Sequence, residues 1–429
     1  MDGELLNHIP LSLMSESENL SNLVEMRNKK GGRMELLIVT SIAHYKVGEF
    51  LYAYGPYTRE IDIWADLFEK VLIAAPLGSD ALPAHCTPFT RNNISILPQL
   101  ETGGVKYRHK LLQILALPIH VWNLSFAMSK VDAIHIRCPG NLGLLGVLLA
   151  PLFSRYCIAK YAGQWNGYRG EPISERMQRF ILGAWWWRKG LVTVYGEWPC
   201  QPRQVVPFFT SMMTAEQVQH GAVVARNKRL TLPAEILYSG RLVPHKGVDI
   251  LLRSLKLLLN QGLACKLAIL GDGPERNGLL ELTQELGLTG HVHFVGAVSY
   301  NEVMSWYERS HILVLPSFHS EGWPKVLAEA MCYGLVCVGT DHGLVPWLLQ
   351  NRGKVVPVAD VEGLATGLRG ILEDASVYDT LSKQASAWAQ DYSLQGLQKA
   401  LGDLLANRWG YKLTDANAGL RSTKEQNLQ

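Results

Sequence analysis

Short, continuous apolar runs recur along this chain, and stretches with helical spacing of their hydrophobic residues separate them. Such runs are typical of strands buried on both faces of a parallel sheet, and parallel strands need helical crossovers. The first series of runs lies at residues 35–41, 71–76, 94–97, 133–137, 157–161 and 191–195. The second series lies at residues 235–239, 266–270, 292–295, 312–315 and 336–339. Two such series predict an α/β protein with two Rossmann-like, doubly wound domains that face a cleft.

The length of 429 residues also favours two domains, because a single hydrophobic core rarely grows to this size. We expect a flexible leader at residues 1–33, an N-terminal, acceptor-binding domain at 34–225 and a C-terminal, nucleotide-sugar-binding domain at 226–395. A C-terminal helix and a loose tail are expected at residues 396–429. Residues 225–233 are polar and basic, and we interpret them as the interdomain linker. The expected helices lie at residues 63–68, 174–187, 248–260, 276–286, 300–309, 324–333 and 361–375.

Cysteine usage and hydropathy indicate a cytoplasmic protein. The seven cysteines are scattered, without Cys-x-x-Cys pairs or histidines at zinc spacing, which favours reduced thiols over a disulfide framework. Residues 1–33 lack the apolar core of a secretion signal. The longest apolar runs, at residues 111–122 and 142–153, are shorter than the roughly 20 residues that cross a bilayer. We therefore expect no transmembrane helix.

Charge is unevenly distributed along the chain. Residues 106–203 carry 13 Lys or Arg against 4 Asp or Glu, whereas residues 231–429 carry 17 against 20. The basic stretch also contains Trp122, Trp165 and the run Trp185–Trp187. One interpretation is a surface that contacts an anionic membrane peripherally or binds a phosphorylated acceptor. The other is an ordinary solvated face with tryptophans in the core. Nucleic acid is not expected as a partner, since no stacking or groove-reading motif accompanies the charge.

A glycine and two cations follow the strand at residues 235–239. Gly240 permits a tight turn, and Arg241 and Lys246 place two positive charges at the strand's end. In open α/β sheets ligands bind beyond the carboxyl ends of the strands, so this pair suits a diphosphate. The alternative is a solvent-facing loop with incidental charges.

Two glutamates flank the start of the helix expected at residues 324–333. Glu321 lies in the loop before the helix, and Glu329 lies in its second turn. Pro324 suits a first helical position, and Gly334 is well placed to end the helix. A helix N-terminus presents free amides and a positive dipole, which favour phosphate. The alternatives are a capping carboxylate for Glu321 and a surface glutamate for Glu329.

The combination of this Arg/Lys loop with two glutamates eight residues apart resembles a known family. The family is the retaining glycosyltransferases of the GT-B fold, specifically glycosyltransferase family four (glycosyl transferases group 1). The resemblance extends from about residue 236 to about residue 368. It includes the motifs Gly271-Asp272-Gly273-Pro274, Val295-Gly296 and Leu315-Pro316-Ser317, and the segment 353–358.

The resemblance implies a role for each matching residue. Arg241, Lys246 and Glu321 would be the catalytic residues, the two cations stabilising the leaving diphosphate and the glutamate contacting the transferred sugar. Glu329 would accept hydrogen bonds from the ribose. The other donor-binding residues would be Gly240, Gly271, Asp272, Gly273, Gly322, Trp323, Lys325, Leu344 and Val345. The only cofactor-like ligand implied is a nucleotide-sugar donor, with UDP or GDP as the nucleotide. No metal is expected, because no Asp-x-Asp motif stands in a supporting context.

The chain departs from the family pattern in three places. Pro324 follows Trp323 where a second glycine is common, which removes a backbone donor. Residues 342–347 lack the glutamate usual in that loop. The His-x-His usual in the N-terminal domain reads here as His135-Ile136-Arg137.

The acceptor side is expected in the N-terminal domain. Alternation along a strand puts His135 and Arg137 on one side. Arg137 suits either an acceptor hydroxyl or phosphate, or a structural ion pair, and His135 suits either the sugar or the interior. The loop expected at residues 41–48 adds acceptor candidates, namely His44, Tyr45, Lys46 and Gly48.

The resemblance therefore implies a retaining, hexosyl-type glycosyltransferase acting in surface polysaccharide, glycolipid or other glycoconjugate synthesis. Its partners would be the nucleotide-sugar donor and a saccharide, lipid-linked or small-molecule acceptor. We expect it in the cytoplasm, with contact to the inner face of the membrane as a further expectation. Two alternatives remain open: an epimerase or hydrolase of nucleotide sugars on the same fold, and a non-catalytic nucleotide-sugar-binding protein.

Overall fold

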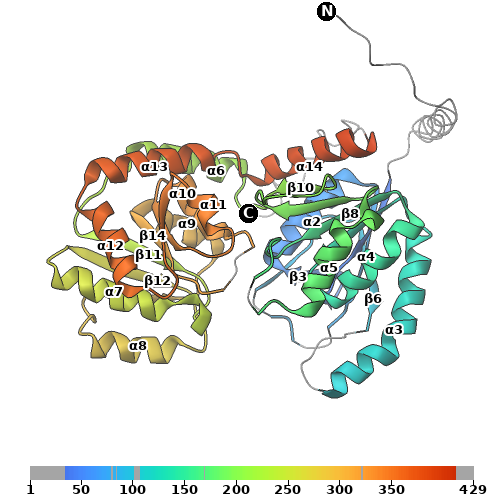
Figure 1. The fold of residues 1–429 in the computed structure, drawn as a ribbon, viewed down its shortest axis with the longest axis horizontal. Helices are drawn as coiled ribbons and strands as arrows, with labels where there is room; N and C mark the ends of the chain where they lie inside the picture. Colours follow the sequence, from blue (N-terminus) through green and yellow to red (C-terminus); the bar gives the residue numbers. More distant parts are fainter. Residues whose placement is uncertain are drawn as a thin grey trace, which may run out of the picture.

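Two parallel sheets, each covered by helices on both faces, form the body of the protein (Figure 1). The computed structural model describes residues 34–78, 81–83, 85–100, 107–168, 170–319 and 322–411, with only the backbone described for residues 107–114. The first sheet has the order β10-β9-β8-β7-β1-β4-β6, and the second has the order β13-β12-β11-β14-β15-β16. In both sheets the chain builds outward from one strand and then returns to its other side, as in doubly wound folds. The predicted fold class, two Rossmann-like domains, is confirmed.

The strands occur close to the predicted apolar runs. The first sheet consists of β1 (Glu35–Val39), β4 (Lys70–Pro76), β6 (Ile94–Gln99), β7 (Ala133–Cys138), β8 (Tyr156–Tyr161), β9 (Leu191–Tyr195) and β10 (Val205–Phe208). The second consists of β11 (Ala234–Ser239), β12 (Cys265–Leu270), β13 (Val292–Gly296), β14 (Ile312–Leu315), β15 (Val336–Thr340) and β16 (Gly353–Val356). Alternation along β1 shows why a continuous apolar run is needed. Leu36 and Ile38 pack into one core cluster, and Leu37 and Val39 pack into the cluster on the opposite face.

Two groups of helices cover the first sheet. On one face lie α2 (Gly55–Leu67) and α14 (Leu394–Trp409), and on the other lie α3 (Tyr107–Met128), α4 (Asn141–Phe153) and α5 (Ile173–Gly183). A short 3-10 turn, η1 (Trp185–Trp187), follows α5 where the sequence predicts that the helix continues. Among the described helices, none combines the length and the apolar character needed to cross a membrane.

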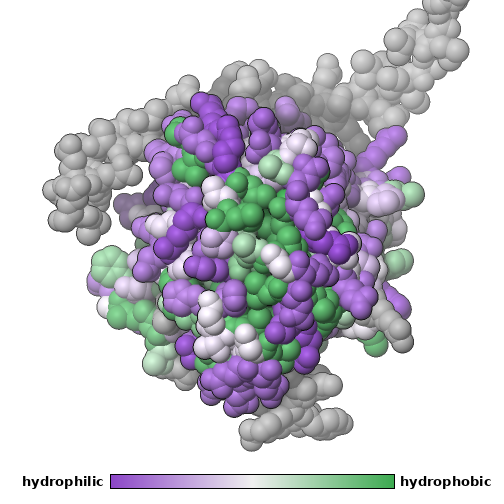
Figure 2. Space-filling view, turned by 90° about the vertical axis from the view of Figure 1, so that its left-hand side faces the viewer, coloured by the Kyte–Doolittle hydropathy of each residue, from purple (hydrophilic) through white to green (hydrophobic). Residues whose placement is uncertain are grey.

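The second sheet is covered in the same way. One face carries α7 (Val248–Asn260), α8 (Arg276–Glu285) and α12 (Val361–Leu372), and the other carries α6 (Ala215–Asn227), α9 (Tyr300–Arg309), α10 (Lys325–Cys332) and α11 (Val345–Leu349). α13 (Ala375–Ala389) contributes residues to the hydrophobic core clusters on both faces of the second sheet. Figure 2 views this end of the molecule and shows hydrophilic residues around a hydrophobic band.

A small antiparallel sheet follows β1, where the sequence predicts a loop at residues 41–48. It consists of β2 (His44–Val47), β3 (Phe50–Tyr54) and β5 (Cys86–Pro88). The prediction of a loop is therefore wrong for residues 44–47. β2 could not be recognised from the sequence, because only one of its four residues, His44, is buried. A strand of this kind has no apolar run and is defined by its pairing with β3.

The chain passes between the two domains twice. After β10, α6 packs against α10 and α13 of the second domain, although most of it lies before the domain boundary predicted at residue 225. Lys228, in the predicted linker, donates to the carbonyl oxygens of Tyr307, Glu308 and Ser310. At the other end α14 packs against α2, and the Tyr411 hydroxyl donates to the Leu67 carbonyl.

All seven cysteines are free thiols, as predicted. Five of them are buried, Cys86 is half-buried and Cys200 is exposed.

Candidate functional site

Two loops at the carboxyl edge of the second sheet are joined through their backbones. The Leu242 amide donates to the Asp272 carbonyl at 3.0 Å, and the Glu275 amide donates to the Leu242 carbonyl at 3.1 Å. A Cβ on Gly271 would lie within 1.9 Å of the Gly240 carbonyl oxygen, and one on Gly273 within 2.2 Å of the Leu242 oxygen. Only glycine permits this approach, so the structure brings the Arg241 loop and the Gly271–Gly273 loop together.

The loop after β14 joins the same group. The Phe318 amide donates to the His245 carbonyl at 2.8 Å, and the Ser317 carbonyl accepts from the Thr340 hydroxyl at 2.6 Å. Gly247 has φ +67°, and a Cβ there would lie 2.3 Å from the Pro316 carbonyl oxygen. Arg241 is exposed and Lys246 is half-buried in η2 (Pro244–Lys246). The backbone around Arg241 and Lys246 is therefore held at the ends of three strands. The sheet thus fixes the positions of the Cα atoms from which these two side chains extend.

Glu321 lies outside the described residues, and its role stays a prediction. Its neighbour Gly322 touches the first domain, since a Cβ there would lie within 2.4 Å of the Ala162 carbonyl oxygen. Trp323 is 6% exposed and packs among Tyr195, Leu344 and Leu348. It also stacks on Trp388, with ring centroids 6.2 Å apart. The Trp323 ring therefore belongs to an interdomain aromatic cluster.

Glu329 is 5% exposed, so the alternative of a surface glutamate is wrong. Its two carboxylate oxygens accept hydrogen bonds from the hydroxyls of Tyr300 and Tyr307, at 3.2 and 3.0 Å. Burial raises the pKa of Glu329, opposed by the hydrogen bond from Tyr307 and the charge of Lys325. Sequence reasoning missed both tyrosines, which α9 supplies. The predicted hydrogen bonds to a ribose would share this carboxylate with them.

Leu344 and Val345 are each 1% exposed. A Cβ on Gly196, just after β9, would meet Leu344 Cδ1 within 2.3 Å. These two side chains therefore pack in the interior and at the domain contact, and any contact with a ligand would come from their backbone. Lys325, the first residue of α10, is half-buried and within electrostatic reach of Tyr195 and Glu329.

Arg137 and His135 both contact α2, as expected for residues that alternate along a strand. The Arg137 guanidinium donates to a Glu60 carboxylate oxygen at 2.8 Å, which confirms the ion-pair interpretation. His135 is 0% exposed and stacks on Trp64 with ring centroids 4.4 Å apart. Burial and the neighbouring charge of Arg137 lower the pKa of His135 to about 3. His135 is therefore a neutral interior residue in this structure.

Glu60 also accepts a hydrogen bond from Lys160, at 2.7 Å. Burial alone would raise the pKa of Glu60, but the charges of Arg137 and Lys160 outweigh it and hold that pKa well below its ordinary range. Burial lowers the pKa of Lys160 to about 8. Sequence reasoning missed Glu60 and Lys160. Two cations against one carboxylate leave this edge of the first sheet net positive.

The four acceptor candidates in the β2–β3 hairpin differ in how deeply they are buried. His44 is 0% exposed, its Nδ1 lies 2.9 Å from the Ile42 carbonyl oxygen, and burial lowers its pKa to about 4. Tyr45 is half-buried, while Lys46 and Gly48 are exposed in and after β2. His44 is thus a core residue, which contradicts its expected place in a loop facing an acceptor.

Tyr54, 46% exposed at the end of β3, is within electrostatic reach of Arg241 and Lys246.

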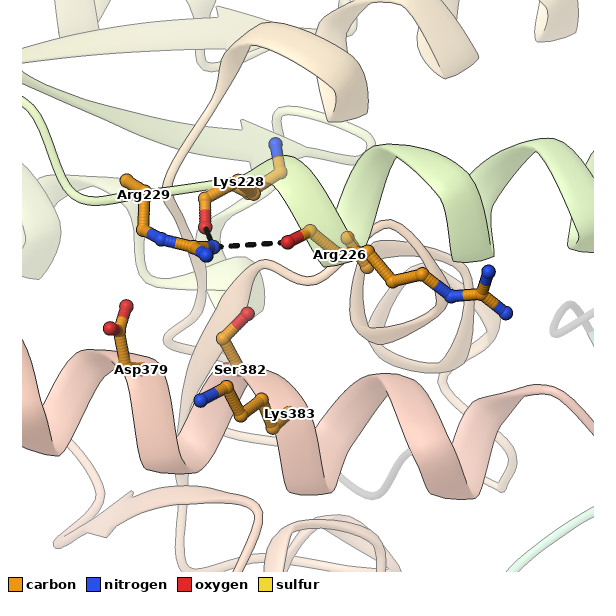
Figure 3. A pocket seen from close by; sticks show the side chains of 7 residues that line it. Arg226, Lys228, Arg229, Asp379, Ser382 and Lys383 are labelled. Carbon is orange, nitrogen blue, oxygen red and sulfur yellow. Dashed lines mark hydrogen bonds between the residues drawn. The ribbon is translucent and has the colours of Figure 1, made fainter.

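No group of three or more His, Cys, Asp or Glu side chains suited to a metal ion occurs among the residues that the structure describes. A small hollow of about 150 Å³ lies between the end of α6 and α13 (Figure 3). None of the residues that line it is a candidate site residue. They are Ala225, Arg226, Lys228, Arg229, Asp379, Ser382 and Lys383.

Comparison with known proteins gives the family of one part of the chain. Residues 225–388 match the model of the family "Glycosyl transferases group 1". Over 183 residues the chain is 28% identical to the putative colanic acid biosynthesis glycosyltransferase WcaL of Salmonella typhimurium, covering 41% of this chain and 45% of that protein. Over 143 residues it is 34% identical to a phosphatidyl-myo-inositol mannosyltransferase of Mycolicibacterium smegmatis, covering 32% of this chain and 36% of that protein. The chain thus spans less than half the length of these relatives.

Solved structures extend the likeness to both domains. Sucrose-phosphate synthase from Thermosynechococcus elongatus matches with a TM-score of 0.63 at 18% identity, covering 88% of this chain and 100% of that one. Anabaena HepE, in complex with UDP and glucose, matches with a TM-score of 0.62 at 17% identity, covering 87% of this chain and 99% of that one. The protein therefore has the GT-B fold, and it carries a glycosyl transferases group 1 domain over residues 225–388.

Proposed function

We propose that this protein is a retaining glycosyltransferase that moves a sugar, of the hexose type, from a nucleotide-sugar donor to an acceptor hydroxyl. The observation that carries the proposal is the junction of three loops around Arg241 and Lys246 at the carboxyl edge of the second sheet. That edge is where open α/β sheets bind ligands. The group 1 domain over residues 225–388 supports the same conclusion. HepE, which shares the fold, was solved with UDP and glucose, which supports a nucleotide-sugar donor.

In this proposal Arg241 and Lys246 bind the donor diphosphate, and their charges stabilise it as it leaves. The loop Gly271–Gly273 borders the nucleotide, and Gly322 and Lys325 approach the sugar and phosphates from the start of α10. Glu321 binds the hydroxyls of the transferred sugar. Glu329, held by Tyr300 and Tyr307, has little freedom to turn and would present a preoriented carboxylate to the ribose.

The chemistry breaks the bond between the anomeric carbon and the leaving phosphate oxygen and forms one to the acceptor oxygen. The acceptor hydroxyl attacks from the face that the phosphate leaves, and its proton passes to the departing phosphate oxygen. The anomeric configuration is then retained, and no protein base is needed. Charge on the departing diphosphate is neutralised by Arg241 and Lys246, so the reaction requires no divalent metal.

We assign the acceptor to the first domain, where Arg137, Glu60 and Lys160 form a buried, net positive group at the carboxyl edge of its sheet. The acceptor class would be a saccharide, a lipid-linked saccharide or a small metabolite. A role in surface polysaccharide or glycolipid synthesis is supported by relatives such as WcaL.

The proposal is tested by replacing Lys246 with alanine. We expect the turnover rate to fall by about 100-fold or more, because one charge that stabilises the transition state is lost. Lys266→Ala is the matched control, since Lys266 is exposed at the amino end of β12, the edge opposite the candidate site. Initial rates of nucleoside diphosphate release, with acceptor present, give the readout. A Lys246→Ala rate equal to wild type would remove this lysine from the mechanism.

Chelation and omission of the acceptor test the remaining steps. We expect activity to persist in excess EDTA. Complete loss of activity that is reversed by added Mg²⁺ would contradict the metal-free proposal.

Without acceptor, nucleoside diphosphate release should fall to a small fraction of the rate measured with acceptor. Undiminished release would indicate a hydrolase instead, and conversion of the donor to an isomeric donor would indicate an epimerase.

A further inference from the structure

The outer face of α3 carries a stripe of exposed hydrophobic side chains. Leu115, Ile119, Trp122 and Phe126 are 65%, 51%, 74% and 61% exposed. Their spacing of four, three and four residues places them on one face of the helix. A helix that packs only on its own sheet turns such a stripe inward, whereas here it faces away from the core.

The neighbouring helices carry stripes of the same kind. On α5, Ile173, Met177 and Phe180 are 83%, 43% and 76% exposed, again at helical spacing. On α4, Leu148 and Leu152 are 42% and 63% exposed. α4 contacts both α3 and α5, and the three helices lie side by side over one face of the first sheet (Figure 1). The stripes therefore belong to one layer, which we call the α3–α5 face and which ends at the exposed Trp185 of η1.

This concentration of apolar surface is unusual within the molecule. Of the 22 exposed large hydrophobic residues in the described part of the chain, 12 lie between residues 115 and 185. Single exposed hydrophobic residues are common on soluble proteins, but a gathered set of this size marks a surface that contacts something else.

Exposed charge on the same segment has one sign. The exposed charged residues between 115 and 190, in the part that the structure describes, are all basic: Lys130, Arg155, Arg176, Arg188 and Lys189. The acidic residues of the segment are half-buried, and Glu171 is paired with Arg179. Lys130 lies over the Phe126 ring at 5.4 Å, so a cation and an aromatic stripe residue adjoin.

We propose that the α3–α5 face docks the protein peripherally on an anionic lipid bilayer. Aromatic and aliphatic side chains flanked by lysine and arginine suit the boundary between acyl chains and anionic headgroups. A second copy of the chain fits less well, because a two-fold contact through this face would set its cations against their own copies. The proposal goes beyond the proposed function and does not depend on it, since binding is measured without substrate.

The cations show at which edge of the first sheet the bilayer would lie. Lys130 precedes β7, Arg155 precedes β8, and Arg188 and Lys189 precede β9, so all four lie at the amino edge of the sheet. Phe126 and Leu152, near the ends of α3 and α4, lie at the same edge. The bilayer would therefore contact the α3–α5 face mainly at its amino edge, on the side opposite the carboxyl ends of β7 and β8.

The test is cosedimentation of the full chain with vesicles of phosphatidylcholine alone or mixed with phosphatidylglycerol. We expect binding to the mixed vesicles that weakens with added salt, because headgroup attraction is screened. The double variant Trp122→Ser with Phe180→Ser should bind at least about tenfold more weakly, equivalent to about 1.4 kcal/mol. Arg188→Gln with Lys189→Gln should lose affinity for the mixed vesicles.

The matched control is Val223→Ser with Leu232→Ser, which removes exposed hydrophobic residues (53% and 64%) from the second domain. This control should bind as wild type does, and circular dichroism should show all variants folded because every site is exposed. The proposal is overturned if wild type binds neither vesicle, if the Trp122/Phe180 variant binds undiminished, or if the control loses as much. It is also overturned if light scattering shows a dimer that only the Trp122/Phe180 variant abolishes.

Discussion

At the scale of single residues, Glu60 organises the acceptor edge of the first sheet. It is 4% exposed and compensates two cations, Arg137 and Lys160, which approach from different strands. Lys160 also lies over the Tyr195 ring at 5.1 Å, and Arg137 over the Tyr57 ring at 4.9 Å. Removing one member of a buried ion pair leaves uncompensated charge, which is costly in a medium that solvates charge poorly.

Glu60→Gln should therefore lower the free energy of unfolding by about 3 kcal/mol at neutral pH. The pKa of Glu60 is lower in the folded protein than its ordinary value of 4.5, so its ionisation stabilises the fold above about pH 4.5. That contribution is lost as the pH falls from 4.5 toward the lower folded pKa, and the gap between wild type and variant should narrow there.

Urea denaturation of both proteins, at neutral and at acidic pH, gives the measurement. Glu35→Gln is the control, since Glu35 pairs with the exposed Lys70 and such surface pairs contribute little. An unfolding free energy for Glu60→Gln that equals wild type at neutral pH would show that the triad does not stabilise the fold.

At the scale of elements, Lys228 joins the end of α6 to the end of α9. Its ammonium donates to three carbonyl oxygens at 2.6 to 2.8 Å, which belong to Tyr307, Glu308 and Ser310. The last carbonyls of a helix have no partners within it, so a cation at this position satisfies them and suits the helix dipole. The side chain is 9% exposed, and burial lowers its pKa to about 7.

Lys228→Met should lower the free energy of unfolding by about 2 kcal/mol, because buried carbonyls would lose their donor. Hydrogen exchange should show faster exchange at the amides of α6 and α9 than in wild type. Lys383→Met is the matched control, since Lys383 lines the same hollow from α13 but is exposed (Figure 3). If both variants unfold at the same denaturant concentration as wild type, Lys228 does not hold the two helices together.

At the scale of the whole molecule, two glycines lie at contacts between the domains where a side chain would not fit. Gly196 of the first domain packs on Leu344 of the second, and Gly322 of the second packs on the Ala162 carbonyl of the first. Trp323 adds an aromatic cluster at the same junction, with Tyr195 and Phe209 from the first domain. The relative position of the sheets in this structure thus depends on residues without side chains at two points.

Gly322→Ala should shift the domains apart, since its Cβ would fall 2.4 Å from a backbone oxygen that has little freedom to move. We expect turnover to fall by about tenfold or more, with only a small change in the unfolding free energy of either domain. Gly278→Ala is the control, because nothing lies within 4 Å of a Cβ there. Activity and small-angle scattering give the readouts, and full activity in Gly322→Ala would mean that this contact does not position the domains.

Local sequence determined the elements whose hydrophobic pattern repeats over several residues. α7 at Val248–Asn260, α9 at Tyr300–Arg309 and β14 at Ile312–Leu315 have the bounds that the pattern predicts. The loops that carry Arg241 and Gly271 were also predictable, because they directly follow buried strands and contain glycines. In each case the informative residues are neighbours in sequence, so burial of one face leaves a periodic trace.

Tertiary structure alone decided the features that depend on distant segments. β2 exists through pairing with β3, and the charge partner of Arg137 lies 77 residues away, on α2. Trp323 belongs to a hydrophobic cluster that contains residues from both domains. Such contacts leave no periodic trace, since a single glutamate or tryptophan looks the same in a sequence whether it meets solvent, ligand or another helix. Which of these it meets is decided by the chain's long-range packing, and the energy of that packing is shared among residues far apart in sequence.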